Sequence, residues 1–228
     1  MFDMDGTTVR HMNPRLLNVL EGLDDLSYKI GGFIRKRIGL GTKRAPLEGT
    51  VNRGKKPRLL VHRAIHKIRR KEVDRIVEPC PGIIDLLGFF AAKNIPMGIA
   101  SNGLGEGYGH DILKTFDLEK FFKASVFRED THRAKPAPDI LFTLLERMDI
   151  KPNKDDVIWY IGDRRKDLQA AKAADEILPC SVIPLGFGVK ASLAAVEMGL
   201  PQRQVILNYF EFQEMLARDV FSQSASGS

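Results

Sequence analysis

The start of the chain holds side chains whose types and spacing suit acid–base or metal chemistry. Asp3 and Asp5 stand two residues apart, and Gly6 follows them. Because alternate residues of a strand project from the same face, these carboxylates would repel each other unless a cation or a phosphate lay between them. One acid could then act as a nucleophile and the other as a proton donor. A surface strand that ends in an Asp-Gly turn is the alternative interpretation of these residues.

Three later segments carry polar side chains where a predicted element ends or begins. Residues 101–103 (Ser-Asn-Gly) follow the apolar run 95–100, and residues 162–167, which include two further aspartates, follow the apolar run 157–161. Lys135 stands just before a predicted apolar helix. In open α/β sheets, ligands bind at the carboxyl ends of the strands. The sequence therefore predicts one rim of acids, a hydroxyl and a lysine, which a phosphate with a divalent cation would use.

The four segments together resemble the haloacid dehalogenase-like superfamily of hydrolases, in its phosphoglycolate phosphatase/β-phosphoglucomutase-like branch. The motifs that carry the resemblance are Asp3-x-Asp5-Gly6-Thr7, Ser101-Asn102-Gly103, Lys135-Pro136 with Pro138-Asp139, and Gly162-Asp163-x-x-x-Asp167. They occur in the family's order and cover residues 1–9 and roughly 78–210. The resemblance implies an α/β fold: a Rossmann-like, doubly wound parallel sheet with an inserted α-helical cap subdomain.

The resemblance also implies a role for each acid. Asp3 would be the nucleophile that forms an aspartyl-phosphate. Asp5 would protonate the leaving oxygen and then activate water, which calls for a pKa above that of Asp3. Asp3, the backbone carbonyl of Asp5 and Asp163 would bind Mg²⁺, a hard cation that takes oxygen ligands. Asp167 would support this site from behind, by orienting a water on the metal or by pairing with Lys135.

The phosphate would be bound by a second group of residues. Ser101 and the amide of Asn102 would hold a phosphoryl oxygen, and Lys135 would neutralise charge on the transferring group. Thr7 would bond either the phosphate or its own loop. Asp5 favours phosphate esters, because family members that act on carbon–halogen or carbon–phosphorus bonds lack this acid. The prediction is an Mg²⁺-dependent phosphatase, with a sugar phosphomutase as a lesser alternative.

Other candidate residues have simpler interpretations. His11, at an expected hinge, could touch the substrate. His62 and His66 are more typical of a solvated basic helix face than of a metal site. The glycine-rich stretch 103–109 could cradle a phosphate or merely connect a strand to a helix. Asp139 is interpreted as an acid in the first turn of a helix.

The predicted sheet and its helices occupy the C-terminal two-thirds of the chain and its first residues. Strands are predicted at 1–4, 95–100, 124–127, 157–161, 181–185 and 205–207. Helices are predicted at 82–93, 110–115, 139–148, 165–173, 190–198 and 211–220. Residues 1–9 and 79–228 would form the catalytic core, and residues 10–78 a basic helical cap with hinges near 9–12 and 78–81.

Charge is distributed unevenly along the chain. Residues 29–71 hold fifteen Lys and Arg and one acid, a net charge of +14, so the rest carries −8 against the total of +6. This favours an electrostatic funnel for a phosphorylated small-molecule or polyanionic substrate. Nucleic acid is a less favoured partner, since few aromatic side chains accompany the basic run. The alternative function is a polyanion- or nucleic-acid-binding protein on the same scaffold.

The composition of the chain bears on its cellular compartment. The sequence contains no run of about 18 apolar residues, so no membrane span is predicted. The first residues do not resemble a secretory signal. Cys80 and Cys180 indicate buried or incidental thiols in a reducing compartment, and hence a cytoplasmic protein. Only Met1 and Phe2 precede Asp3, where a buried strand would have about five apolar residues. We therefore expect an apolar extension upstream to stabilise the fold.

Overall fold

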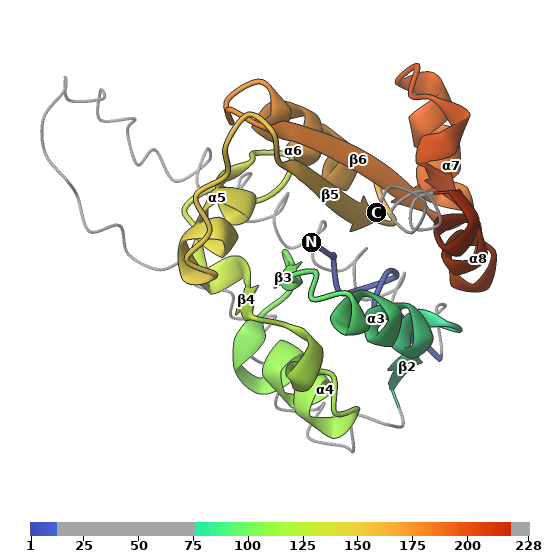
Figure 1. Ribbon diagram of the computed structural model, residues 1–228. Coiled ribbons are helices and arrows are strands. Elements are labelled where there is room, and N and C mark those ends of the chain that lie inside the picture. Colours follow the sequence, from blue (N-terminus) through green and yellow to red (C-terminus); the bar gives the residue numbers. More distant parts are fainter. Residues whose placement is uncertain (13–75, 220–228) are drawn as a thin grey trace, which may run out of the picture. The chain divides into compact units, whose positions relative to one another are not determined.

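The computed structural model describes residues 1–12 and 76–219, and within them the chain forms a parallel sheet with helices on both faces (Figure 1). The strands are β1 Val9–His11, β2 Val77–Pro79, β3 Gly98–Ala100, β4 Ala124–Val126, β5 Val157–Gly162, β6 Ser181–Phe187 and β7 Val205–Ile206. The helices are α3 Ile83–Ala92, α4 His110–Thr115, α5 Asp139–Arg147, α6 Arg165–Asp175, α7 Gly188–Glu197 and α8 Tyr209–Asp219. The predicted cap, apart from its two ends, lies outside the described residues.

The first residues of the chain lie in the middle of the sheet. Phe2 bridges in parallel to Ile99 of β3 and to Ile161 of β5, so that the order is β4-β3-Phe2-β5-β6-β7. The Phe2 amide donates to the Gly98 carbonyl at 2.9 Å, and the Asp3 amide donates to the Ile161 carbonyl at 2.8 Å. The predicted strand at 1–4 is thus in the expected place but is shorter, because the chain turns at once after Asp3.

Successive strand residues send their side chains into two separate halves of the core. Ile99 and Ile161 pack with α3 and α8, whereas Ala100 and Tyr160 face α5 and α6. Figure 1 shows these two helix pairs on opposite sides of β5 and β6. The alternation follows from the period of two in an extended strand. The parallel pairing of the strands places their carboxyl ends at one edge of the sheet, which is where the candidate residues begin.

The two predicted hinges form a paired ribbon. β1 and β2 are antiparallel, with Val9 opposite Pro79 and His11 opposite Val77. Val9 and Val77 are fully buried in the main core. The predicted linkers at 9–12 and 78–81 thus include a paired ribbon whose apolar side chains pack on the body, and their role as hinges stays a prediction.

Most predicted elements are confirmed, with small shifts at their ends. β3 begins at Gly98 and not at residue 95, since Pro96 has no amide hydrogen for a sheet. β6 runs on to Phe187, because Gly186 pairs with both Gly162 and Val205. Among residues 1–12 and 76–219, no helix is long and apolar enough to cross a bilayer.

Candidate active site

A buried lysine connects three of the four predicted motifs. Lys135 Nζ lies 2.6 Å from Asp3 Oδ1 and 2.7 Å from Asp167 Oδ1. It also donates to the Ala100 carbonyl at 3.1 Å and to the Tyr160 hydroxyl at 2.7 Å. Only 4% of the Lys135 surface is exposed. The lysine is therefore a fixed charge inside the protein and not a solvated surface group.

The electrostatics of this group leave an excess of negative charge. Burial, together with Asp167 and Asp163 nearby, raises the pKa of Asp3 to about 7 against the opposing effect of Lys135. Burial also disfavours the charged lysine, but Asp3 and Asp167 hold the pKa of Lys135 well above its usual range. Lys135 is thus always charged, and a single ammonium faces several carboxylates.

Three carboxylates lie close enough to share one cation. Oxygens of Asp3, Asp163 and Asp167 lie within 4.8 Å of one another. Asp163 Oδ1 is buried and has no hydrogen-bond partner in the described part of the chain. Burial raises the pKa of Asp163 to about 6. An unpartnered buried oxygen among hard oxygen donors fits a divalent cation such as Mg²⁺.

Asp167 is engaged on both of its oxygens. Its Oδ2 accepts the Arg164 amide at 3.0 Å, which caps the first turn of α6, and its Oδ1 faces Lys135. Its Cβ fits only because residue 162 is glycine, where any side chain would overlap it. Asp3 and Asp163 are therefore the two acids better placed to ligate a metal directly, and Asp167 is better placed to support them.

Gly6 brings the first motif and the fourth motif together. Its φ is +85°, and a Cβ at this position would overlap the carboxylate of Asp163. A glycine is thus required twice, once for the left-handed turn and once for the close approach. The turn that follows Asp5 therefore packs directly against Asp163, the candidate metal ligand.

Asp5 lies in a different environment from Asp3. Its Oδ1 accepts the Tyr108 hydroxyl at 2.6 Å and lies 3.3 Å from His11 Nε2. Burial opposes ionisation, but the hydrogen bonds from His11 and Tyr108 lower the pKa of Asp5 below its usual value. The expected order, with the pKa of Asp5 above that of Asp3, is therefore reversed in the ion-free protein. A bound cation would lower the pKa of Asp3 and narrow this difference.

Comparison with known proteins agrees with this geometry. The family model described as haloacid dehalogenase-like hydrolase matches residues 1–176.

The chain belongs to the haloacid dehalogenase-like hydrolases.

Two named relatives and one solved structure are similar to this chain. Phosphoglycolate phosphatase of Escherichia coli K12 is 34% identical over 108 residues, 47% of this chain and 40% of that enzyme. The phosphorylated carbohydrates phosphatase of Thermotoga maritima is 29% identical over 145 residues, 63% of this chain and 65% of that one. The chain thus matches less than half the length of the first relative. A T. maritima structure assigned as a β-phosphoglucomutase has a TM-score of 0.60 at 22% identity, covering 96% of this chain and 97% of that one. At this identity the structural likeness shows the fold alone.

The residues of the second motif and Thr7 differ in their contacts within this haloacid dehalogenase-like core. Ser101 is buried beside Asp5, and its Oγ accepts the Gly103 amide at 3.0 Å. The Asn102 side chain binds the backbone of Lys135, accepting its amide at 3.0 Å and donating to its carbonyl at 3.4 Å, and the expected contact of the Asn102 amide with a phosphate stays a prediction. Thr7 is fully buried, and its hydroxyl has no partner among the residues that the structure describes.

The glycine-rich stretch is packed against its neighbours. Residues Gly105–Gly109 form an irregular turn, in which Glu106 (ψ 122°) and Gly107 (φ 74°) depart from helical geometry. Side chains at Gly105 or Gly109 would overlap the ring of Phe127, and the amides of Gly105 and Glu106 donate to Glu129 at 2.8 and 2.9 Å. Since Glu129 already accepts the amides of Gly105 and Glu106, these two amides are not available to a phosphate. The turn also supplies Tyr108, whose contact with Asp5 the sequence analysis did not predict.

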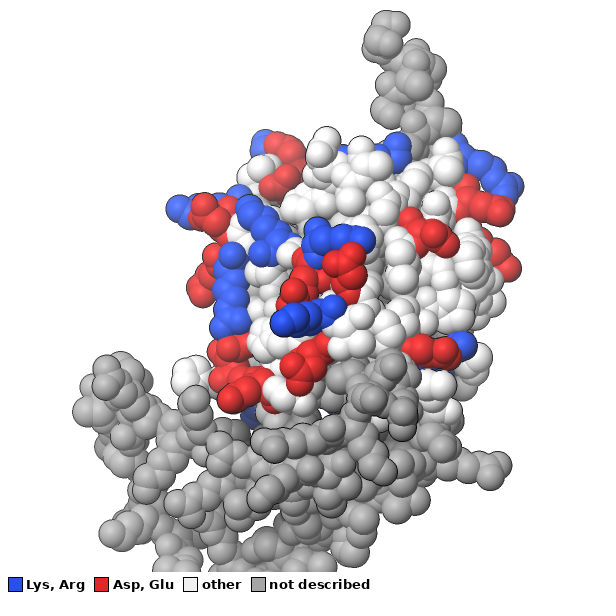
Figure 2. Space-filling view, turned by 90° about the horizontal axis from the view of Figure 1, so that it is seen from below, with Lys and Arg blue, Asp and Glu red and all other residues white. Residues whose placement is uncertain are grey.

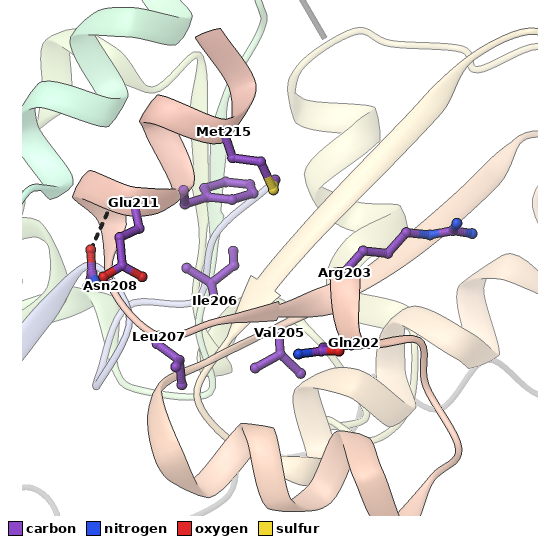
Figure 3. A pocket seen from close by; sticks show the side chains of 9 residues that line it. Gln202, Arg203, Val205, Ile206, Leu207, Asn208, Glu211 and Met215 are labelled. Atoms are coloured by element: carbon purple, nitrogen blue, oxygen red, sulfur yellow. Dashed lines mark hydrogen bonds between the residues drawn. The ribbon is translucent and has the colours of Figure 1, made fainter. Parts of the chain in front are cut away.

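A hollow lies away from the acidic residues of the candidate site. It has a volume of about 450 Å³ and lies between β7 and α8, lined by apolar side chains such as Ile206 and Met215 with Arg203 at its side (Figure 3). None of the predicted site residues lines it.

On the face in Figure 2, acidic and basic side chains alternate in small groups. The basic run at 29–71 lies outside the described residues.

Proposed function

We propose that this chain is an Mg²⁺-dependent phosphomonoester hydrolase that forms an aspartyl-phosphate on Asp3. The observation that carries the proposal is the buried group of Asp3, Asp163 and Lys135, in which one carboxylate oxygen lacks a partner. Such a group balances its charge when it receives a divalent cation, and the lysine and cation together attract a phosphate. The names of two relatives, both phosphatases, support the same reaction.

The first step is a displacement at phosphorus. A carboxylate oxygen of Asp3 attacks, the bond between phosphorus and the ester oxygen breaks, and Asp5 gives a proton to the leaving oxygen. Because the lowered pKa of Asp5 leaves it ionised in the free protein, Asp5 takes up this proton from solvent when the substrate binds. Ser101 and Lys135 bind oxygens of the transferring group, and Lys135 neutralises part of its charge. Mg²⁺, held by Asp3, Asp163 and the Asp5 carbonyl, would supply further charge stabilisation on the phosphoryl oxygens.

The second step releases phosphate. Asp5, now ionised, takes a proton from a water molecule that attacks phosphorus, and the bond from phosphorus to Asp3 breaks. Asp167 keeps Lys135 in place during both steps, and Asn102 holds the backbone from which the lysine projects. Asp3 is then a free carboxylate again, and Asp5 returns its proton to solvent.

The substrate would be a small or polyanionic organic phosphate. We assign residues 10–78 to a cap over the core formed by 1–9 and 79–228, because the excess positive charge at 29–71 would attract such a substrate. Retention of nucleic acid binding in an inactive variant would instead favour the polyanion-binding alternative. Dependence on an added sugar bisphosphate would favour a mutase.

The test is the hydrolysis of 4-nitrophenyl phosphate by the wild type and by Asp3→Asn, with Mg²⁺ or with a chelator. We expect turnover only in the wild type with Mg²⁺, and far-ultraviolet circular dichroism to show that both proteins are folded. Turnover by the variant, or equal turnover in the chelator, would contradict the proposal.

A further inference from the structure

Asp5 is held from a side that the steps above do not use. Tyr108 comes from the turn after the second motif and His11 from the end of β1, and both meet the same carboxylate oxygen. We propose that Tyr108, supported by His11, is a positioning residue that fixes Asp5 for proton transfer. The inference rests on the proposed function and deepens it, because it explains how the proton donor is aimed.

The direction of the hydrogen bonds follows from the number of protons. The Tyr108 hydroxyl lies 2.6 Å from Asp5 Oδ1 and 3.0 Å from His11 Nε2. A phenol has one hydrogen to donate, and an ionised carboxylate can only accept. Tyr108 therefore donates to Asp5 and accepts from His11, which must carry a hydrogen on Nε2 and shares it between the Tyr108 oxygen at 3.0 Å and Asp5 Oδ1 at 3.3 Å. The chain of donors runs from His11 through Tyr108 to Asp5, and each bond strengthens the next.

The two oxygens of Asp5 then have different tasks. Oδ1 is occupied by Tyr108, so Oδ2 is the oxygen that can carry a proton to a substrate. A Cβ at Gly103 would lie 3.2 Å from Asp5 Oδ2 and 3.2 Å from Ser101 Oγ. Asp5 Oδ2 and the Ser101 hydroxyl thus border the same space, and the glycine keeps that space open. An ester oxygen beside a phosphate bound at Ser101 would meet Oδ2.

The positioning pair is itself rigidly supported. Tyr108 is 8% exposed, and its ring stacks on that of His11 with centroids 6.3 Å apart and planes 10° from parallel. Its turn is fixed on Phe127 and by Glu129, as described above. His11 pairs with Val77 in the ribbon. Two separate elements therefore constrain the direction of one carboxylate, and such preorganisation lowers the cost of reaching the reactive geometry.

The experiment compares two esters that differ in their need for a proton. Phenyl phosphate has a much poorer leaving group than 4-nitrophenyl phosphate, and kcat/KM covers the steps through departure of that group. For Tyr108→Phe with Mg²⁺, we expect kcat/KM to fall about 10- to 100-fold on phenyl phosphate but less than about threefold on 4-nitrophenyl phosphate. A merely structural role would lower both values equally.

Tyr209→Phe is the matched control. It also removes a buried tyrosine hydroxyl, but one that donates to the Thr7 carbonyl at 3.0 Å and does not touch Asp5. The ratio of kcat/KM for the two esters should be unchanged in this control. An unchanged ratio in Tyr108→Phe would overturn the inference.

Variants of His11 decide the matter if Tyr108→Phe does not fold. His11→Gln keeps an N–H donor in reach of the Tyr108 oxygen, whereas His11→Ala removes it. We expect the ester ratio to shift in the alanine variant and to return toward the wild-type value in the glutamine variant; equal ratios in both would overturn the inference. Failure of the proposed function is seen separately, as a wild type that hydrolyses neither ester, and the inference would fall with it.

Discussion

Asp3 and Asp5 are two residues apart but lie in opposite kinds of environment. Around Asp3, three carboxylates gather near one buried lysine, and an oxygen of Asp163 has no partner in the described part of the chain. Around Asp5, a tyrosine and a histidine satisfy one carboxylate oxygen completely. The carboxylates on the Asp3 side therefore carry excess negative charge that a cation would balance, whereas Oδ1 of Asp5 already has its partners in the folded protein.

The largest expected effect comes from removing the lysine on the Asp3 side. Lys135→Met would leave Asp3 and Asp167 buried without their cation, at a cost of about 3–5 kcal/mol in the free energy of unfolding. Urea unfolding of the metal-free protein measures this cost. The control is Lys120→Met, which breaks an exposed ion pair with Asp117 and should cost less than about 1 kcal/mol. Similar losses in the two variants would show that Lys135 is not a buried countercharge.

The next effect tests the contact that joins the first and fourth motifs. Gly6→Ala strains a left-handed residue and pushes Asp163 away, so we expect the free energy of unfolding to fall by about 1–3 kcal/mol and the Mg²⁺-dependent turnover to be lost. Gly199→Ala has similar backbone strain at φ +67° but meets no atom within 4 Å. If this control lost as much turnover as Gly6→Ala, the Asp163 contact would not be the cause.

The sequence predicts the Asp3 side far better than the Asp5 side. Asp3, Lys135 and Asp163 each follow or precede a regular element, and the geometry of a parallel sheet brings such positions to one edge. Tyr108 could not be found in this way, because its hydrogen bond to Asp5 depends on the shape of one irregular, glycine-rich turn. The sequence did offer one signal, because Tyr108 is the sole aromatic residue among the glycines at 103–109.

The same distinction holds for the fold. Strand and helix positions follow from apolar periodicity, and α4 was predicted at both ends. The pairing of β1 with β2 was not, because three-residue strands carry too little pattern and their partners are far apart in sequence. The predicted cap at 10–78 stays a prediction, since residues 13–75 are outside the part of the chain that the structure describes.

A third test separates stability from function on the Asp3 side. Asp163→Asn replaces a buried carboxylate whose pKa is raised to about 6, so at pH 8 it should stabilise the metal-free protein by about 1–3 kcal/mol while abolishing turnover. Thermal unfolding without Mg²⁺ measures the gain in stability, and hydrolysis of 4-nitrophenyl phosphate with Mg²⁺ measures the loss of turnover. Thermal unfolding with Mg²⁺ measures how far the cation stabilises the variant. Stabilisation of this variant by Mg²⁺ to the wild-type extent would contradict a role for Asp163 as a ligand.

The smallest effect is the pH dependence of the cation's stabilisation. The folded pKa values of Asp3 and Asp163, about 7 and about 6, lie above the unfolded value of 3.8, so the folded metal-free protein binds more protons between pH 4 and 7 and loses stability as pH rises through this range. Protons and Mg²⁺ compete for the same carboxylates. Stabilisation by a fixed Mg²⁺ concentration should therefore be about 1–2 kcal/mol greater at pH 8 than at pH 6. The Asp5 carboxyl itself adds nothing in this window, because its lowered pKa places its titration at more acid pH. Tyr108→Phe should accordingly leave the Mg²⁺ effect and its pH dependence unchanged, and a shift in that variant would mean that the two sides are not separate.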